Sequence, residues 1–266
     1  MTFLRKVLGI GRWQYGFEVA YRFNRIVWAS SLPIILLATY FLWTSIYAYS
    51  GQTIINGMTL NELIVYYLAV QITIMFSASM VDAHIPRLVK KGLLIRYIVK
   101  PFNFVLFWFI RSVWRSLFRT FAVLLPLFAL AFVIIDFSSI TFNIPGYMLS
   151  VILALFLNFF YIFSVAMICF WVKEYEGIRV IRRGVANVFN GAIIPLTFFP
   201  LVFQKAFSYL PFQYMLYVPI QILLGKYSYE QSITMMLIQL MWIIVFALIS
   251  IFAWKKAQAQ FMGVGV

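Results

Sequence analysis

The sequence predicts an all-α polytopic membrane protein that crosses the bilayer with six helices. Of its 266 residues, 64% are hydrophobic and only 11% are charged, whereas about 25% of the residues of a soluble domain are charged. The hydrophobic residues gather in six runs, and a helix needs about 20 apolar residues to cross a bilayer. Nearly all basic residues fall in alternate connections between these runs, as expected when loops on one side retain positive charge.

Residues 1–25 are expected to form an amphipathic helix that lies on the cytosolic membrane surface. Apolar residues recur there at helical spacing, from Leu4 to Tyr21, with basic residues such as Arg5 and Arg12 between them. A signal peptide is excluded, because the apolar run that follows is about 24 residues long, too long for a signal sequence, and lacks a small-x-small cleavage site.

The six apolar runs define a membrane domain over residues 26–254. We expect crossings at residues 26–49, 60–81, 120–135, 147–172, 185–203 and 233–254, each flanked by polar residues, Gly or Pro. The third run is short. The apolar stretch from Phe102, which has arginines set into it, predicts that this helix begins earlier, in the cytosolic interface.

The basic residues predict the orientation in the membrane. Of the 21 Lys and Arg residues, only Lys205 and Lys226 lie outside the connections that we assign to the cytosol. Because cytosolic loops retain Lys and Arg during insertion, we expect both termini in the cytosol, with residues 255–266 as a cytosolic tail. Contact of the basic cytosolic segments with the anionic lipids of the inner leaflet then explains the net charge of +14, and no nucleic-acid partner is needed to account for it.

Residues 184–224 carry a single charge, Lys205, and allow two interpretations. The stretch is interrupted by four prolines: Pro195, Pro200, Pro211 and Pro219. These breaks favour one broken span followed by a re-entrant hairpin on the outer side, at residues 204–225. Two full crossings would instead make seven spans and put the C-terminus outside.

The sequence lacks the residues and motifs of an enzyme or a metalloprotein. One cysteine, Cys169, and one histidine, His84, cannot build a disulfide framework or a Cys/His metal site within one chain. No GxxxxGK[ST] phosphate loop, GxSxG serine elbow or HExxH zinc helix occurs. We therefore expect no catalytic residues, no metal and no cofactor bound by this chain.

Polar residues within the apolar runs are the candidates for a translocation path. They are Asn187, Asn190, Gly191 and Pro195 in the fifth run, Asn158 in the fourth and Gln239 in the sixth. A broken helix at membrane depth is tolerated only where protein or a cavity covers the freed backbone groups. The alternative is a kinked packing helix, with the amides as interhelical hydrogen bonds.

Two basic segments on the predicted cytosolic side also have alternative interpretations. Residues 82–101 can form short amphipathic helices, either as a membrane-hugging loop or as a docking surface for a cytosolic partner. Arg111, Arg115 and Arg119 recur every four residues and form a helical stripe of about 12 Å. These arginines either snorkel to the inner headgroups or form a basic rim that attracts anionic headgroups of a substrate.

The apolar runs contain no acidic or basic residue at mid-span that would bind a coupling ion, so the energy for transport is expected from another polypeptide.

Several short motifs follow the basic N-terminal segment in order: Gly92-Leu93-Leu94, Lys100-Pro101, Asn190-Gly191, Ile194-Pro195-Leu196, Phe198-Phe199-Pro200, Leu210-Pro211-Phe212, Pro219 and Gly225. In this order and at these depths, the motifs resemble the permeases of ABC-2 type exporters, in particular their six-span bacterial branch.

The resemblance, which covers most of the chain, implies a permease that pairs with a second permease, identical or paralogous. The pair would dock on two copies of a separate ATPase, which would bind ATP and Mg. The candidate coupling residues toward the ATPase are His84, Pro86, Arg87, Lys90, Lys91, Gly92 and Arg96. The candidate outer gate consists of Pro200, Leu210, Pro211 and Pro219.

The same resemblance implies export across a bacterial plasma membrane, but it does not carry over a substrate. The uncharged, aromatic-rich spans are compatible with a hydrophobic or amphipathic cargo, such as a drug, lipid or peptide. The alternative function is a self-sufficient secondary transporter or channel that has no ATPase partner.

Overall fold

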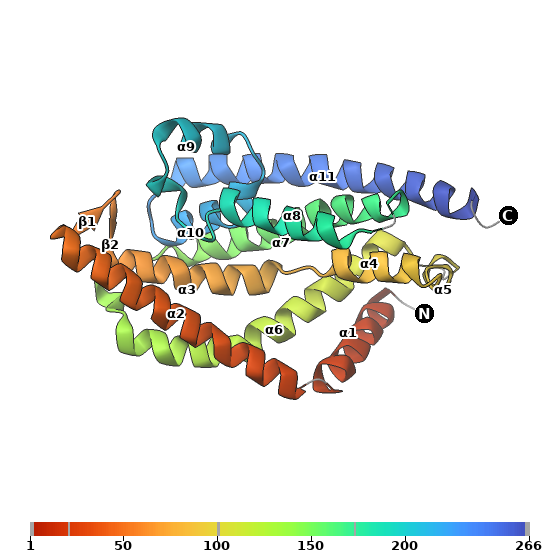
Figure 1. Cartoon of the computed structure of the whole chain (residues 1–266), viewed down its shortest axis with the longest axis horizontal. Coiled ribbons are helices and arrows are strands. Elements are labelled where there is room, and N and C mark those ends of the chain that lie inside the picture. The colour runs from red at the N-terminus through yellow and green to blue at the C-terminus, as the bar shows by residue number, and fades with distance from the viewer. Residues whose placement is uncertain (1–2, 21, 100–101, 173, 264–266) are drawn as a thin grey trace.

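The computed structural model describes residues 3–20, 22–99, 102–172 and 174–263. Long helices run along the longest axis of the molecule, and one short β-hairpin is the only sheet in the described part (Figure 1). Tyr21, Lys100, Pro101, Lys173 and residues 264–266, which entered the sequence analysis, lie outside the described residues.

The two ends of the bundle differ in what they carry (Figure 1). One end, which we call the termini end, holds both termini and the helices α1 (Phe3–Ala20), α4 (Val81–Lys90) and α5 (Ile95–Ile98). The opposite end, the β-hairpin end, holds the strands β1 (Ile54–Ile55) and β2 (Met58–Thr59).

Five helical segments of the described chain are long and apolar enough to cross a membrane. They are Val27–Ser50, Leu60–Lys90, Phe104–Ile134, Ile144–Phe170 and Tyr229–Phe261. These segments contain the predicted crossings two and six completely, crossings one and three except for one residue each, and most of crossing four. The prediction of an all-α, multi-pass membrane protein is therefore confirmed, with five candidate spans rather than the expected six.

The predicted N-terminal helix is present as α1. It lies against α6 (Phe104–Ile134) near the start of α2 (Arg22–Ser50). Its buried residues are Gly11, Gln14 and Glu18, whereas apolar residues such as Leu4 and Leu8 are exposed. The buried amide and carboxylate are drawn inward because α6 presents arginines at this position.

The helix α3 (Leu60–Ser77) forms the centre of the bundle, since all of its residues from Leu63 to Gln71 are buried. Thr59 and Glu62 form a capping box that fixes its start. The chain leaves helical geometry at residues 78–80 and resumes as α4, so the predicted second crossing and the start of the predicted coupling segment are separate helices. The amphipathic short helices expected within residues 82–101 are thus present as α4 and α5.

The helix α6 begins at Phe104, where Asn103 caps it, and this agrees with the early start expected for the third crossing. It is followed by α7 (Ile144–Ala166), which continues as the short 3-10 helix η2 (Met167–Phe170). The last helix, α11 (Tyr229–Gly263), packs along α7 and extends past the predicted end of the sixth crossing into the predicted tail. Ser164 and Ser250 bond to each other across this helix pair, at 2.9 Å.

The predicted fifth crossing at residues 185–203 is not one continuous helix. The helix α8 (Glu176–Phe189) begins nine residues before the expected start and ends at Phe189, with Asn190 as its C-cap. Gly191 then adopts φ +82°, which favours glycine, and Pro195 and Pro200 prevent the helix from resuming. The expected break is therefore present, but it divides the run into separate short elements.

The segment after the break forms a compact group of short elements near the β-hairpin end (Figure 1). These elements are η3 (Leu196–Phe198), α9 (Leu201–Ser208), η4 (Phe212–Met215) and α10 (Tyr217–Leu223). Lys226 follows these elements in the chain. Its Nζ donates to the Gly57 carbonyl at 3.1 Å and pairs with Glu62 at 2.5 Å. The group is thus attached to the β-hairpin and to the start of α3.

Candidate functional site

A cavity of about 220 Å³ lies between α3, α7, α8 and η4. Three amides that the sequence predicted for a translocation path, Asn158, Asn187 and Asn190, meet at its wall. Two arginines of α8, Arg182 and Arg183, join them. The structure therefore brings together residues that are up to 32 positions apart in the sequence and adds charge that the prediction did not include.

The amides differ in how their hydrogen-bonding groups are used. Asn158 donates through Nδ2 to the Ser77 carbonyl at 3.0 Å, at the point where α3 ends. Asn190 accepts from the Ala192 backbone N–H at 2.9 Å, so its side chain fixes the turn after α8. Asn187 is exposed to the cavity side and has no hydrogen-bond partner among the described residues. Only Asn187 thus keeps a fully available amide.

The two cavity arginines also differ. Arg182 pairs with Asp82 at 2.6 Å, and both side chains are buried, at 9% and 1% exposure. Arg183 is exposed at the cavity wall and has no carboxylate partner among the described residues. One turn nearer the termini end, Arg179 pairs with Glu176. The cavity therefore keeps one uncompensated positive charge, that of Arg183.

Toward the β-hairpin end, tyrosine hydroxyl groups hold the broken segment against α3. Tyr66, which is fully buried, donates to the Gly191 carbonyl at 2.7 Å, and Tyr67 donates to the Ile193 carbonyl at 3.0 Å. The freed backbone carbonyls after α8 thus find partners inside the protein, as a helix break at membrane depth requires.

The other predicted path and gate residues do not line the cavity. Gln239 is fully buried between α7 and η4, where it bonds to Ser150 and to the Tyr214 carbonyl at 2.8–3.0 Å. This geometry corresponds to the interhelical hydrogen bond that was the alternative interpretation. The remaining candidates, which occur in and around the short elements after the break, are Pro195, Pro200, Leu210, Pro211 and Pro219. Only Met215 and Leu216 of these elements reach the cavity wall.

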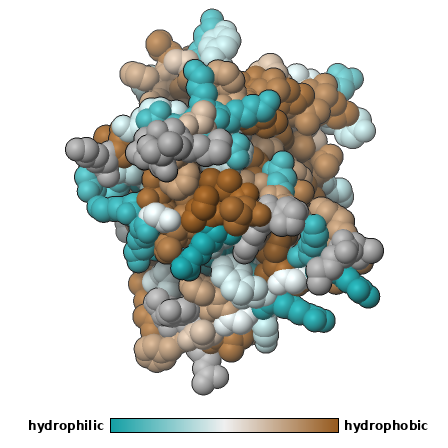
Figure 2. Space-filling view, turned by 90° about the vertical axis from the view of Figure 1, so that its right-hand side faces the viewer, coloured by the Kyte–Doolittle hydropathy of each residue, from teal (hydrophilic) through white to brown (hydrophobic). Residues whose placement is uncertain are grey.

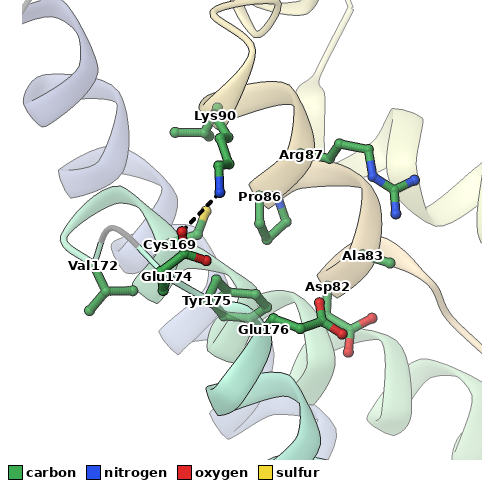
Figure 3. Close-up of a pocket in the computed structure, with 11 residues that line it drawn as sticks. Asp82, Ala83, Pro86, Arg87, Lys90, Cys169, Val172, Glu174, Tyr175 and Glu176 are labelled. Carbon is green, nitrogen blue, oxygen red and sulfur yellow. Dashed lines mark hydrogen bonds and ion pairs between the residues drawn. The ribbon is translucent and has the colours of Figure 1, made fainter.

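A second hollow of about 320 Å³ opens at the termini end, between α4 and the segment that joins η2 to α8 (Figure 3). Pro86, Arg87 and Lys90 of the predicted coupling segment line it. Lys90 points toward Glu174 and pairs with it at 2.9 Å, with both side chains at least 70% exposed. An ion pair this exposed adds little stability, so both groups remain available to a partner.

Tyr175 forms the floor of this hollow beside Asp82. Its hydroxyl is buried and has no hydrogen-bond partner in the described chain. Burial raises the pKa of the Tyr175 phenol, and the nearby Asp82 carboxylate raises it further. The phenol therefore stays neutral at physiological pH, and the charges of the hollow come from its lysine, arginine and carboxylates.

The other predicted coupling residues are divided between surface and interior. Lys91 and Arg96 are exposed, and Gly92 ends the turn after α4 with φ +66°. His84 instead lies against Trp108, with ring centroids 5.8 Å apart, and its Nδ1 is 2.8 Å from the Met80 carbonyl. His84 is thus half-buried against α6. Figure 2 views this end of the molecule and shows hydrophilic residues around an apolar centre.

The arginine stripe of α6 does not reach the cavity. Arg111 lies between Trp13 and Trp108, with its guanidinium carbon 4.7 and 4.8 Å from the two ring centroids. Arg119 lies over Trp28 at 5.2 Å. Arg111 and Arg119 therefore pack against tryptophans of α1, α2 and α6.

Sequence reasoning missed Arg182, Arg183 and Tyr66 as parts of the site. It assigned the two arginines to a connection, because charged residues were taken to end the fourth span. A usable signal was present: Arg179, Arg183, Asn187 and Asn190 recur every three or four residues, which predicts one polar helix face. Nothing in the sequence marks Tyr66, because its partner is a backbone carbonyl 125 residues away.

Comparison with known proteins agrees with this architecture. Residues 34–265 match the model of a family described as ABC-2 family transporter protein. A search among curated proteins finds no significant match. Members of this family are membrane components that generally work with separate ATPase subunits. The match spans most of the chain and includes the helices that build both the cavity and the hollow, and the chain therefore belongs to the ABC-2 family of transporter proteins.

Proposed function

We propose that this chain is the permease subunit of an ATP-binding-cassette exporter in a bacterial plasma membrane. The cavity between α3, α7 and α8 is the inward-facing part of its translocation path, and the cargo is hydrophobic or amphipathic. Both termini are cytosolic in this proposal, so the termini end faces the cytosol and the β-hairpin end faces outward. The exposed basic side chains of α4 and α5 then lie beside the anionic inner leaflet.

The observation that carries the proposal is the buried ion pair between Asp82 and Arg182. Asp82 stands in the first turn of α4, which borders the hollow at the termini end, and Arg182 stands in α8, which borders the cavity. A movement of α4 is thus transmitted directly to a cavity wall. An exporter that is driven by a separate ATPase needs this kind of mechanical link.

The docking surface for the ATPase consists of the exposed basic residues Arg87, Lys90, Lys91 and Arg96 around the hollow. Two ATPase copies would bind ATP and Mg, one under each permease. His84 acts in this arrangement by packing α4 against Trp108, since its ring is not on the exposed face.

A second permease, identical or paralogous, would cover α8. This helix exposes Arg183, Gly184 and Asn187 beside apolar residues such as Val185 and Val188. Polar side chains at membrane depth face protein or a water-filled cavity rather than lipid. Pairing through this side of α8 would enclose the cavity between two permeases, and lipids would cover the other apolar faces.

In the proposed topology, α8 and the broken segment together make the fifth of six crossings. Residues 204–225 would form the re-entrant outer hairpin that caps the exit, with Pro200, Leu210, Pro211 and Pro219 shaping the gate. The attachment of Lys226 to Gly57 and Glu62 supports this assignment, because it keeps both segments at the same end of the molecule.

The test is affinity purification of the full chain from its native host, with co-eluting proteins identified by mass spectrometry. We expect an ATPase at about one copy per permease, and a second six-span protein if the pair is mixed. The variant Arg87→Glu/Lys90→Glu/Lys91→Glu should insert normally but lose the ATPase, because three reversed charges repel a surface that complements the native ones.

The matched control for this variant reverses Arg5 and Arg12 of α1, which are equally exposed at the termini end but lie away from the hollow. Equal ATPase recovery from the α4 variant and the unchanged protein would contradict the docking surface. Elution of the permease alone, even after crosslinking, would contradict the exporter and favour a self-sufficient carrier or channel.

A further inference from the structure

The cavity between α3, α7 and α8 has an uneven set of donors and acceptors. Arg182 is already neutralised by Asp82, but Arg183 is not paired with any carboxylate in the described chain. Among the described residues, no Asp or Glu lines the cavity wall itself. Water-accessible positive charge without a counter-charge is a binding determinant for anions.

Arg183 and Asn187 provide the donors that an anion needs. They are four residues apart on α8, so their side chains are neighbours on one face of the helix. Both border the cavity, and neither has a hydrogen-bond partner within the described residues. In addition, the Nε of Arg182 is buried without a partner. A planar guanidinium beside an amide N–H₂ matches the oxygen atoms of a phosphate or carboxylate group.

The size of the cavity limits what can enter. Its volume is about 220 Å³, whereas pockets that enclose a drug-sized ligand have about 300–1,000 Å³. A headgroup therefore fits, and a long apolar tail does not. Apolar side chains of α8, among them Val180 and Ile181, are exposed along the same helix. They provide a surface on which a tail can lie outside the cavity.

We propose that the cavity binds the anionic headgroup of an amphipathic cargo, a phosphate or carboxylate, through Arg183 and Asn187. This assignment rests on the proposed function and makes its cargo class specific: anionic amphiphiles rather than neutral or cationic ones. Arg182 is a positioning residue, because its charge is committed to Asp82 and it holds α8 at the distance that shapes the cavity.

The experiment measures equilibrium binding of radiolabelled dodecyl phosphate to the full chain in phosphatidylcholine nanodiscs, with empty nanodiscs subtracted. We expect saturable binding that dodecyltrimethylammonium does not displace. Arg183→Gln should weaken binding by at least about tenfold, as expected for loss of a charged hydrogen-bond donor. Asn187→Leu, which removes the amide at similar volume, should weaken binding in the same direction.

The matched control is Arg179→Gln, which removes an arginine one turn away that pairs with Glu176 outside the cavity. Its binding should stay within about twofold of the unchanged protein, because Arg179 does not line the cavity and its charge is balanced by Glu176. Equal loss in Arg183→Gln and Arg179→Gln, or no loss in either, would overturn the proposal. Thermal unfolding of each variant shows whether the chain is still folded.

Two further measurements distinguish a free anion from an anionic amphiphile, and the cargo class from the exporter function. Inorganic phosphate should displace dodecyl phosphate only at much higher concentration. Displacement at equal concentration would overturn the proposal of an amphiphilic ligand and show that the cavity binds a free anion. Binding needs no ATPase, so it remains measurable if the co-purification fails. Arg183-dependent binding without an ATPase would refute the exporter alone, and an ATPase without such binding would refute the cargo class alone.

Discussion

Gly11 of α1 lies directly against Trp114 of α6. A Cβ added there would lie 2.6 Å from Cε2 of Trp114, whose indole also donates to the Val7 carbonyl at 3.2 Å. The indole is therefore held and cannot move aside freely. We expect Gly11→Ala to destabilise the protein by about 1–3 kcal/mol, as overpacking does, which a shift of the thermal unfolding midpoint in detergent would detect.

Two glycines of the same helix serve as controls. A Cβ at Gly9 or Gly16 meets no atom within 4 Å. Because alanine is the better helix former, Gly9→Ala and Gly16→Ala should be neutral or stabilising by up to about 1 kcal/mol. If Gly11→Ala behaved like these two, the close contact between α1 and Trp114 would be disproved.

The pair of Asp82 and Arg182 is the other feature that depends on single residues. Both side chains are buried, so removing one leaves the other charge without a counter-ion. We expect Asp82→Asn and Arg182→Gln each to destabilise by about 3 kcal/mol. The double variant should lose clearly less than the sum, because the uncompensated charge is then gone.

A double-mutant cycle in chemical denaturation measures this coupling. Lys90→Gln and Glu174→Gln, which remove the exposed pair of the neighbouring hollow, are the matched comparison and should couple by less than about 1 kcal/mol. Additive losses at Asp82 and Arg182 would show that α4 and α8 are not connected through this pair.

At the level of elements, the broken segment after α8 depends on its attachment to α3. The Tyr66 hydroxyl bonds to the Gly191 carbonyl at 2.7 Å in a fully buried position. Tyr66→Phe removes the donor and leaves that carbonyl unpaired, at a cost of about 1–3 kcal/mol. We expect faster hydrogen–deuterium exchange across residues 190–200, while exchange within α7 and α11 stays unchanged.

Tyr49→Phe is the control for this prediction, because Tyr49 is 97% exposed and its loss of a hydroxyl should affect no internal contact. Unchanged exchange at residues 190–200 in Tyr66→Phe would mean that the tyrosine contact does not hold the broken segment against α3. Exchange that increases equally in both variants would point to a general loosening.

At the level of the whole molecule, the prediction concerns how often the chain crosses the membrane. Reporter fusions after Ser50 and after Gly225 should both read as external, and fusions at either terminus as cytosolic. The physical reason is that Lys and Arg concentrate in the connections assigned to the cytosol. Gly225 should share the side of Ser50, since its neighbour Lys226 contacts Gly57 and Glu62.

A cytosolic signal after Gly225 would disprove the outer hairpin and reinstate seven crossings. A fusion after Gly92, at the end of α4, is the internal control and should read as cytosolic in both topologies. Its failure would invalidate the assay rather than decide between six and seven crossings.

The membrane fold and its main helices can be predicted from the amino-acid sequence alone. Apolar runs at residues 26–49, 120–135 and 233–254 are each contained almost wholly within a structural helix, because burial in lipid is set by local composition and length. The break after Asn190 was also predictable, since glycine and proline act on their own backbone. The family followed from short motifs that keep their order along the chain.

The tertiary structure alone decided which polar residues meet. The sequence analysis placed Asn158, Asn190 and Gln239 together as candidates for the translocation path. In the structure, Gln239 forms an interhelical hydrogen bond, and the other two residues border a cavity. The sequence analysis also offered Arg111 as part of a basic rim on a vestibule. In the structure, Arg111 packs between two tryptophans, and Arg183 is the arginine at the cavity wall that has no carboxylate partner among the described residues. The physical reason is that a side chain's role depends on its partners, and these come from helices distant in the sequence.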